Sequence, residues 1–249
     1  MRLDKYLANA GLGSRKDVKK LIRSGKITVF GSLETDPGRS IDEENADIQF
    51  LGEPVCYQKH RYYMLNKPPG YITATCDLKE KTVLELISDS DRRNIFPVGR
   101  LDKDARGLLL LTDDGELAHR LLSPTKHVPK VYQVVLEKQI SNQDINAFRD
   151  GLVVDKEFTA KSAMLERDSS DPLKAYVTIV EGKYHQVKRM FAAVNNHVLD
   201  LKRIQMGGLR LDGSLKEGEY RPLNVEEMKT IHLKNENVTV KEIVEANEG

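Results

Sequence analysis

The chain has 249 residues, enough for one large domain or for a small domain and a medium one. Hydrophobic residues make up 39% of it and charged residues 31%, which is typical of a soluble protein with a core of its own. No apolar run approaches the roughly 20 residues that a membrane helix needs, and the N-terminus lacks the apolar stretch of a signal peptide. The two cysteines, Cys56 and Cys76, are too few for a disulfide framework, so we expect buried or half-buried thiols in a reducing cytoplasm.

Charge is distributed unevenly along the chain, although its net value is only +1. Residues 1–30 hold eight Lys or Arg and two Asp, a net charge of +6, whereas residues 235–249 hold four Glu and one Lys, a net charge of −3. A basic N-terminal end and an acidic tail are the asymmetry expected when one end of a chain binds phosphate groups.

The first thirty residues predict two short helices followed by a strand. Leu3, Leu7 and Ala10 recur at helical spacing, and Ser14 can then cap a second helix with Asp17 as its partner three residues on. The cations of this second helix form either an ordinary solvated face or a surface that binds nucleic acid. The candidate RNA contacts in this part of the chain are Arg2, Lys5, Arg15, Lys16, Lys19, Lys20 and Arg23.

The remaining sequence predicts an α+β protein. Residues 31–60 predict short strands and turns that lead to a linker, so we expect a small domain over residues 1–58. Further on, strands alternate with a few short helices, but without the regular rhythm of a parallel doubly wound fold. We therefore expect a second domain over residues 59–234, with a mixed, largely antiparallel sheet and peripheral helices, and an acidic tail over residues 235–249. Strands are predicted at residues 61–66, 108–111, 131–136 and 175–180, and helices after Thr82, at residues 117–122 and after Ser141.

The segment GRLDKDARG (residues 99–107) places a carboxylate, that of Asp102, on a turn between apolar stretches and close to Arg100. A carboxylate that is partly desolvated and kept ionised by guanidinium groups suits a nucleophile or an electrostatic stabiliser. Residue types alone favour a salt-bridged structural turn instead. The Asp and Gly residues from 102 to 113 also have the spacing of a calcium loop, but Arg106 would occupy a ligand position, which excludes calcium.

Two further segments contain candidate functional side chains. Residues 187–194 have the apolar spacing of an amphipathic helix, and His185, Lys188 and Arg189 share its other face. They could bind phosphate or an active-site anion, or form an ordinary basic surface. Tyr132, on a predicted strand, is either a core residue or a surface on which a base stacks. No paired His or carboxylate residues stand at ligand spacing, so we expect no metal site.

Five segments and the N-terminal end together resemble the RsuA-type pseudouridine synthases, which modify uridine in bacterial ribosomal RNA. The N-terminal stretch at residues 2–29 is similar to the S4-type RNA-binding module that precedes their catalytic domain. The resemblance covers residues 1–233 in order, with one departure at residues 29–31, where Val-Phe-Gly replaces the usual Val-Asn-Gly turn. The five segments are NKPPGY (66–71), GRLDKDARGLLLLTDDG (99–115), KVY (130–132), EGKYHQVKRMFAAVNNHV (181–198) and LKRIQMGGLRL (201–211).

The resemblance implies roles for individual residues. Asp102 matches the nucleophile of the family, and Arg100 belongs to the same motif and should organise its turn. Tyr132 matches the tyrosine that packs against the target base. Lys188 matches the basic residue that pairs with the aspartate, with Arg189 as the second choice. The reaction has no redox step, so no cofactor is expected, and the chain contains neither a GxGxxG nor a GxxxxGK[ST] nucleotide-binding loop.

The resemblance also implies the substrate. We expect a monomer that acts on ribosomal RNA or a pre-ribosomal particle. The stretch at residues 185–198 is closer to the small-subunit enzyme, which implies uridine 516 of 16S RNA as the target. Two alternatives stay open: a large-subunit enzyme of the same family, and a non-catalytic RNA-binding protein of ribosome assembly.

Overall fold

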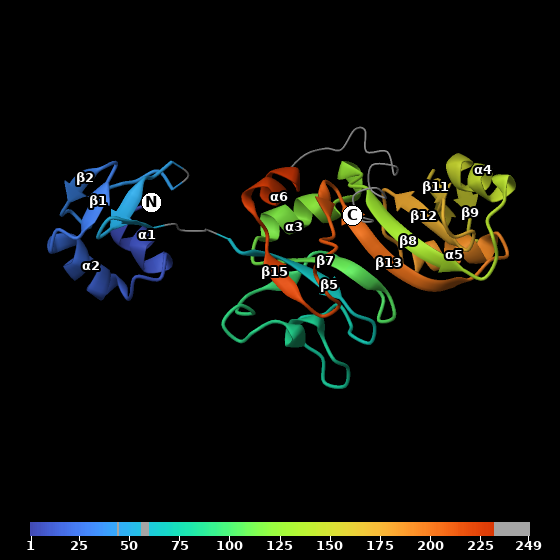
Figure 1. Cartoon of the computed structure of the whole chain (residues 1–249), viewed down its shortest axis with the longest axis horizontal. Coiled ribbons are helices and arrows are strands. Elements are labelled where there is room, and N and C mark those ends of the chain that lie inside the picture. Colours follow the sequence, from blue (N-terminus) through green and yellow to red (C-terminus); the bar gives the residue numbers. More distant parts are fainter. Residues whose placement is uncertain (44, 56–59, 232–249) are drawn as a thin grey trace. The chain divides into compact units, whose positions relative to one another are not determined.

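The computed structural model describes residues 1–43, 45–55 and 60–231 (Figure 1). The chain divides into two compact units, Met1–His60 and Arg61–Gly249. The domain boundary predicted after residue 58 and the predicted acidic tail at residues 235–249 both fall outside the described residues. Within those residues, no helix is both long enough and apolar enough to cross a membrane.

In the first unit, two helices pack against a small antiparallel sheet with strand order β2-β1-β3-β4. The predicted cap is present, because the Ser14 side chain accepts a hydrogen bond from the backbone N–H of Asp17. Buried residues of both helices, among them Leu3 and Ile22, form one core with strand residues such as Ile27. The elements are α1 (Leu3–Asn9), α2 (Arg15–Arg23), β1 (Ile27–Val29), β2 (Ser32–Glu34), β3 (Ile48–Phe50) and β4 (Glu53–Pro54).

The second unit is built on a nine-stranded sheet. Its strands are β5 (Tyr62–Lys67), β6 (Phe96–Pro97), β7 (Arg106–Thr112), β8 (Lys130–Leu136), β11 (Met164–Arg167), β12 (Lys174–Ile179), β13 (Val198–Met206), β14 (Leu209–Arg210) and β15 (Tyr220–Pro222). The main order is β11-β12-β8-β13-β7-β5-β15, with β14 beside β13 and β6 beside β7. Only the β13–β7 pair is parallel among the pairings described, which confirms the mixed, largely antiparallel sheet.

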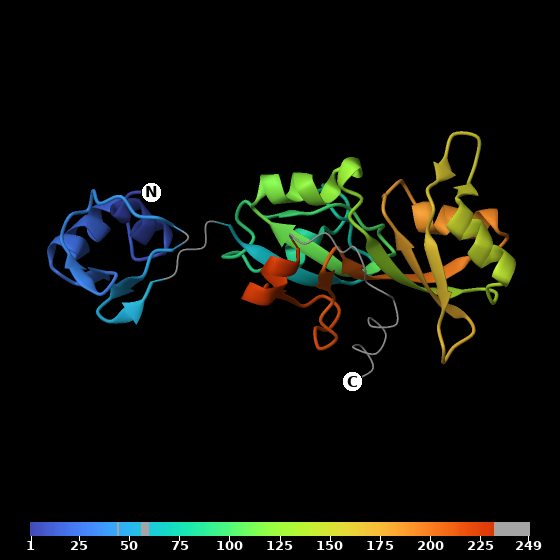
Figure 2. The same ribbon diagram turned by 90° about the horizontal axis from the view of Figure 1, so that it is seen from above.

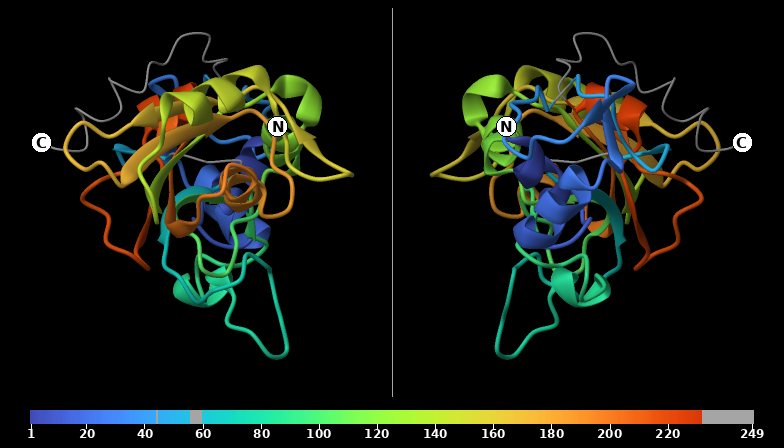
Figure 3. Two further views of the ribbon diagram at one scale, coloured as in Figure 1. Left: turned by 90° about the vertical axis from the view of Figure 1, so that its right-hand side faces the viewer. Right: turned by 90° about the vertical axis from the view of Figure 1, so that its left-hand side faces the viewer.

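Short helices and a small hairpin surround this sheet (Figures 1 and 2). They are η1 (Val83–Leu86), α3 (Gly115–Leu122), η2 (Pro124–Lys126), α4 (Asn142–Asp150), α5 (Gln186–Ala193), α6 (Val225–Thr230) and the strands β9 (Leu152–Val153) and β10 (Thr159–Ala160). The helices predicted after Thr82 and Ser141 are present, and each begins with a capping box, formed with Glu85 and with Asp144. The segment between β5 and β6 projects away from the sheet (Figure 3).

The four consecutive leucines of β7 are explained by a sheet that is covered on both faces. Leu109 and Leu111 belong to a core shared with η1, α4 and α5, whereas Leu108 and Leu110 belong to a second core shared with α3. Successive strand residues point to opposite faces, so a strand that is buried on both sides carries an uninterrupted apolar run.

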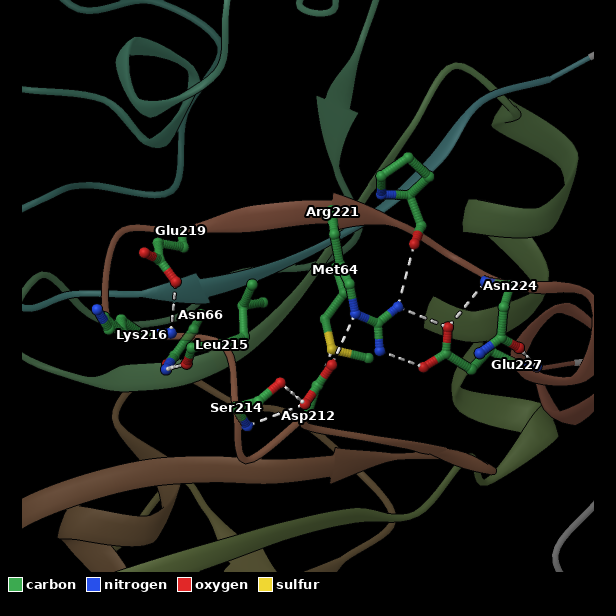
Figure 4. Close-up of polar contacts among 11 residues, drawn as sticks. Met64, Asn66, Asp212, Ser214, Leu215, Lys216, Glu219, Arg221, Asn224 and Glu227 are labelled. Carbon is green, nitrogen blue, oxygen red and sulfur yellow. Dashed lines mark hydrogen bonds and ion pairs between the residues drawn. The ribbon is translucent and has the colours of Figure 1, made fainter.

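Arg221 joins the last strand to the segments on either side of it (Figure 4). Its guanidinium donates to Asp212 at 2.8 Å and to both carboxylate oxygens of Glu227 at 2.7 and 2.8 Å. Hydrogen bonds from Ser214 and from Arg221 hold the pKa of Asp212 at about 2. Nearby, the Asn66 side chain donates to the Leu215 carbonyl at 2.7 Å and ties this region to the end of β5.

Candidate active site

Asp102 lies on a tight turn between β6 and β7. The backbone N–H of Ala105 donates to the Asp102 carbonyl at 3.1 Å and closes the turn. The Asp102 side chain is 24% exposed, so it is partly desolvated yet accessible. Two groups of the 181–194 segment face it: Nε2 of His185 lies 3.5 Å from Oδ1, and Nζ of Lys188 lies 3.8 Å from Oδ2. The structure therefore brings the predicted nucleophile and its predicted counter-charge together.

The turn is held by the segment that follows β5. The Thr73 hydroxyl donates to the Leu101 carbonyl at 2.8 Å and accepts from the Leu101 N–H at 3.1 Å. The N–H of Gly70 donates to the Lys103 carbonyl at 2.8 Å. The Thr73 side chain thus binds both the N–H and the carbonyl of Leu101, the residue before Asp102. The backbone therefore helps to position the Asp102 carboxylate, in addition to the contacts of the carboxylate itself.

A buried lysine lies beneath the same turn. Lys67 has no exposed surface, and its ammonium donates to the carbonyls of Ala105 at 2.7 Å, Pro68 at 3.0 Å and Lys103 at 3.3 Å. Burial lowers the pKa of Lys67 to about 8, against the opposing effect of the Asp104 and Asp102 carboxylates. Lys67 lies in the segment NKPPGY (66–71), but it was not among the predicted site residues. Its position at the end of a largely apolar strand is the sequence feature that could have indicated a structural role.

Lys188 has a closer partner than the one predicted. Its ammonium lies 2.6 Å from both carboxylate oxygens of Asp104, compared with 3.8 Å from Asp102. The hydrogen bond from Lys188 lowers the pKa of Asp104. Asp104 was not among the predicted site residues, although it stands two positions after Asp102 in the same motif. Lys188 therefore joins α5 to both carboxylates of the turn.

Arg189 does not face Asp102. Its guanidinium pairs with Asp155, lies 5.0 Å from the ring centroid of Phe158 and donates to the Tyr184 carbonyl at 3.2 Å. Of the two candidates for the residue that pairs with Asp102, the first choice, Lys188, lies beside it, and the second choice, Arg189, has other partners. Consecutive residues of a helix point about 100° apart, so Lys188 and Arg189 reach different partners.

Arg100 is exposed and makes no hydrogen bond or ion pair with any residue in the described ranges. We had expected Arg100 to organise the Asp102 turn, but among the described residues its side chain makes no hydrogen bond or ion pair that would do so. Its guanidinium is instead available to an anionic ligand at the edge of the site.

Tyr132 is nearly buried, with 7% of its surface exposed, and it belongs to the core cluster that contains Leu101 and Val187. Leu101 precedes Asp102 and Val187 lies on α5, so the Asp102 turn and α5 both contribute to this core. In register on β13, Tyr132 faces Arg203, which is 1% exposed and donates from Nε to the Leu108 carbonyl at 2.8 Å. Nη2 of Arg203 has no hydrogen-bond partner in the described part of the chain. Sequence reasoning did not single out this buried arginine.

The basic residues of the first unit fall into two groups. Asp4 is fully buried, and its carboxylate forms ion pairs with Arg2, Arg15 and Lys19, at nitrogen-to-oxygen distances of 3.2, 3.0 and 3.7 Å. Burial opposes ionisation of Asp4, but hydrogen bonds from the two arginines outweigh it and lower its pKa. The other four candidates have no carboxylate partner among the described residues; they are Lys5, Lys16, Lys20 and Arg23.

No group of three or more potential metal ligands occurs in the described ranges. One expectation about the cysteines is wrong: Cys76 is exposed, because it lies on the segment that projects from the sheet, away from either core. Cys56 falls outside the described residues.

Comparisons with known proteins identify the class to which this fold and site belong. The RNA pseudouridylate synthase family model matches residues 61–193, and the S4 domain model matches residues 1–47. A solved structure described as a pseudouridylate synthase superimposes with a TM-score of 0.65 at 37% identity, covering 93% of this chain and 99% of the other. The chain therefore belongs to the RNA pseudouridylate synthase family, and it is an enzyme of the isomerase class.

Two relatives place it more narrowly. An RNA pseudouridine synthase of Bacillus subtilis, YtzG, is 47% identical over 95% of this chain and 99% of its own length. The ribosomal small subunit pseudouridine synthase A of Escherichia coli is 41% identical over 93% of this chain and the whole of its own. Within the family, the chain is of the RsuA type that its motifs predicted.

Proposed function

We propose that this enzyme isomerises one uridine of bacterial ribosomal RNA, uridine 516 of the small-subunit RNA, with Asp102 as the nucleophile. The observation that supports the catalytic assignment most strongly is the braced turn that presents a partly exposed Asp102 to Lys188 and His185 at 3.8 and 3.5 Å. The similarity to the small-subunit enzyme of Escherichia coli supports the substrate. A cytoplasmic monomer that acts on ribosomal RNA or an assembling particle fits this function.

The chemistry requires few groups. The bond from C1′ of the ribose to N1 of the base breaks, the uracil turns, a bond forms between C1′ and C5, and the C5 proton is lost while N1 gains one. The ionised Asp102 has three chemically allowed first roles: addition to the base, addition to C1′, or removal of a proton from the sugar. The target base must leave its stack to reach this carboxylate. The family resemblance assigns Tyr132 to pack against the target base, and Lys188 supplies positive charge 3.8 Å from Asp102.

A map of pseudouridines in a strain that lacks the gene tests this proposal. We expect one pseudouridine of 16S RNA, at position 516, to disappear, and every other pseudouridine to persist. Wild-type protein should restore it, and Asp102→Asn should not. If all the small-subunit pseudouridines persisted while one in 23S RNA vanished, the proposed substrate would be wrong. If no pseudouridine of ribosomal RNA changed, ribosomal RNA would be excluded as the substrate.

A further inference from the structure

An exposed aromatic ring lies at the rim of the site. Tyr184 exposes 71% of its surface. Its ring stacks on the imidazole of His185, with centroids 3.8 Å apart and planes 18° from parallel. His185 in turn lies 3.5 Å from Asp102. Two stacked rings therefore lead outward from the carboxylate, and the outer ring is largely uncovered.

The backbone around this pair is fixed. His185 precedes α5 with a φ of +49°, a left-handed conformation that is uncommon for residues other than glycine. Gln186, which is 4% exposed, accepts from the Lys183 N–H at 3.0 Å and donates to Glu181 at 2.8 Å. Arg189 holds the Tyr184 carbonyl at 3.2 Å. Tyr184 is thus an exposed ring on a pre-organised loop, unlike a freely rotating surface side chain.

The charges next to Tyr184 and before Asp102 suit a nucleic acid. Lys183, next to Tyr184, is exposed and has no ion-pair partner in the described part of the chain, and the same holds for Arg100 beside the Asp102 turn. Flat aromatic rings flanked by cations are the surface on which the bases of single-stranded RNA stack while phosphates meet the charges. When a uridine leaves its stack to reach Asp102, its neighbour loses a stacking partner.

We propose that Tyr184, supported by His185, is a stacking platform for a nucleobase adjacent to the target uridine. This inference rests on the proposed function and adds a binding site for the flanking nucleotide. The platform holds the RNA strand in the opened conformation, so its contribution belongs to substrate binding. Asp102 and Lys188 remain the groups at the reacting nucleotide.

The test uses the full-length enzyme and a 16S RNA fragment in which either nucleotide beside the target is native or abasic. On native RNA, Tyr184→Ala should lower kcat/KM roughly tenfold or more, mainly through KM, and Tyr184→Phe should restore it. On RNA that is abasic at the stacked position, wild type should fall to the level of Tyr184→Ala, which itself should hardly change. Leu199→Ala, which removes a side chain that is 67% exposed on β13, is the matched control and should behave as wild type.

Three results would overturn the platform. Tyr184→Ala could match wild type on native RNA, or it could lose the same factor on native and abasic RNA. The effect could also appear only with assembled particles and never with naked RNA, which would assign Tyr184 to a protein contact. Asp102→Asn on the same RNA separates the two proposals: if that variant retained activity, the proposed function itself would fail, whereas its inactivity beside a fully active Tyr184→Ala would reject the platform alone.

Discussion

Asp102 depends on residues that do not touch its carboxylate. Thr73 binds both backbone groups of Leu101, and Lys67 holds the carbonyls of Lys103 and Ala105 on the other side of Asp102. Pre-organisation of this kind matters because a displacement of about 1 Å in a catalytic group can cost roughly a hundredfold in rate. The turn is therefore where we expect conservative substitutions to have large effects.

Thr73 provides the sharpest such test. Thr73→Val keeps the shape of the side chain and removes the hydroxyl, so the turn should loosen and kcat should fall roughly tenfold to a hundredfold. Thr73→Ser keeps the hydroxyl and should restore most of the activity. Steady-state kinetics on ribosomal RNA measure this. Equal activity of the Val and wild-type enzymes would show that these two hydrogen bonds do not position Asp102.

Lys67 gives stability a pH dependence. Its pKa of about 8 lies below the ordinary value of 10.5, so between these two pH values the unfolded chain binds more protons than the folded one. The free energy of unfolding should therefore rise with pH across this window, by at most ~3 kcal/mol, and Lys67 should make no pH-dependent contribution below it. Urea unfolding of wild type and Lys67→Met from pH 7.5 to 10.5 measures the difference. Parallel curves for the two proteins would contradict the lowered pKa.

Only some of the residues of the site could be predicted from the sequence. Asp102, Lys188 and Tyr132 could be named because the family resemblance gives a role to each. By contrast, Lys67 and Arg203 lie in quoted segments without an assigned role. Lys67 and Arg203 are cations, which sequence reasoning assigns to surfaces. Their burial follows from strand pairing, which brings Lys67 and Arg203 to either side of Gly107. That arrangement is a property of the sheet and is not visible in any local stretch.

At the scale of elements, β7 and β13 meet unusually closely at Gly107. A Cβ atom at this position would lie 2.3 Å from the Arg203 carbonyl oxygen, and the φ of +99° disfavours any other residue. The parallel pairing of these strands, and with it the start of β7 just after the Asp102 turn, requires a glycine here.

We therefore expect Gly107→Ala to destabilise the protein by at least about 2 kcal/mol, because both the backbone conformation and the contact are unfavourable. Gly115→Ala is the matched control: it lies at the start of α3 in open space and should be neutral or slightly stabilising. Urea unfolding at pH 7 compares the two. Equal stabilities would mean that the strands can separate at this point without cost.

Elements with local signals were predicted correctly. The caps at Ser14, Thr82 and Ser141 depend on residues three apart, so they appear in the sequence itself. The helix predicted at residues 187–194 matches α5 to within one residue, but the left-handed conformation of His185 before it was not predicted, because it has no sequence pattern of its own. The strand order of the sheet depends on long-range pairing and was also beyond reach.

At the scale of the whole molecule, the first unit supplies a basic surface. Fewer of its cations are available to bind phosphate than its net charge suggests. Asp4 neutralises cations at the start of α1 and α2, whereas Lys16 and Lys20 lie one helical turn apart without carboxylate partners in the described ranges. Lys5 and Arg23 are equally unpaired in the part of the chain that the structure describes. These four cations should therefore make the phosphate contacts of this unit.

Replacing Lys16 and Lys20 with alanine should weaken binding to ribosomal RNA and reduce its dependence on salt. Each lost phosphate contact lowers the slope of log K against log salt by roughly 0.7–0.9, so the pair should lower it by up to about 2. Lys229→Ala, a cation paired with Glu226 on α6, is the control and should leave the slope unchanged. An unchanged slope in the double variant would show that Lys16 and Lys20 do not contact the phosphates of the RNA.

The most direct test of the central claim is the conversion of uridine to pseudouridine by Asp102→Asn, measured in a single turnover with enzyme in excess over ribosomal RNA. Asp150→Asn, at an exposed carboxylate on α4, is the control and should react as wild type. We predict that Asp102→Asn binds the RNA with wild-type affinity and forms no detectable pseudouridine. Conversion at the wild-type rate would contradict the assignment of Asp102 as the catalytic carboxylate.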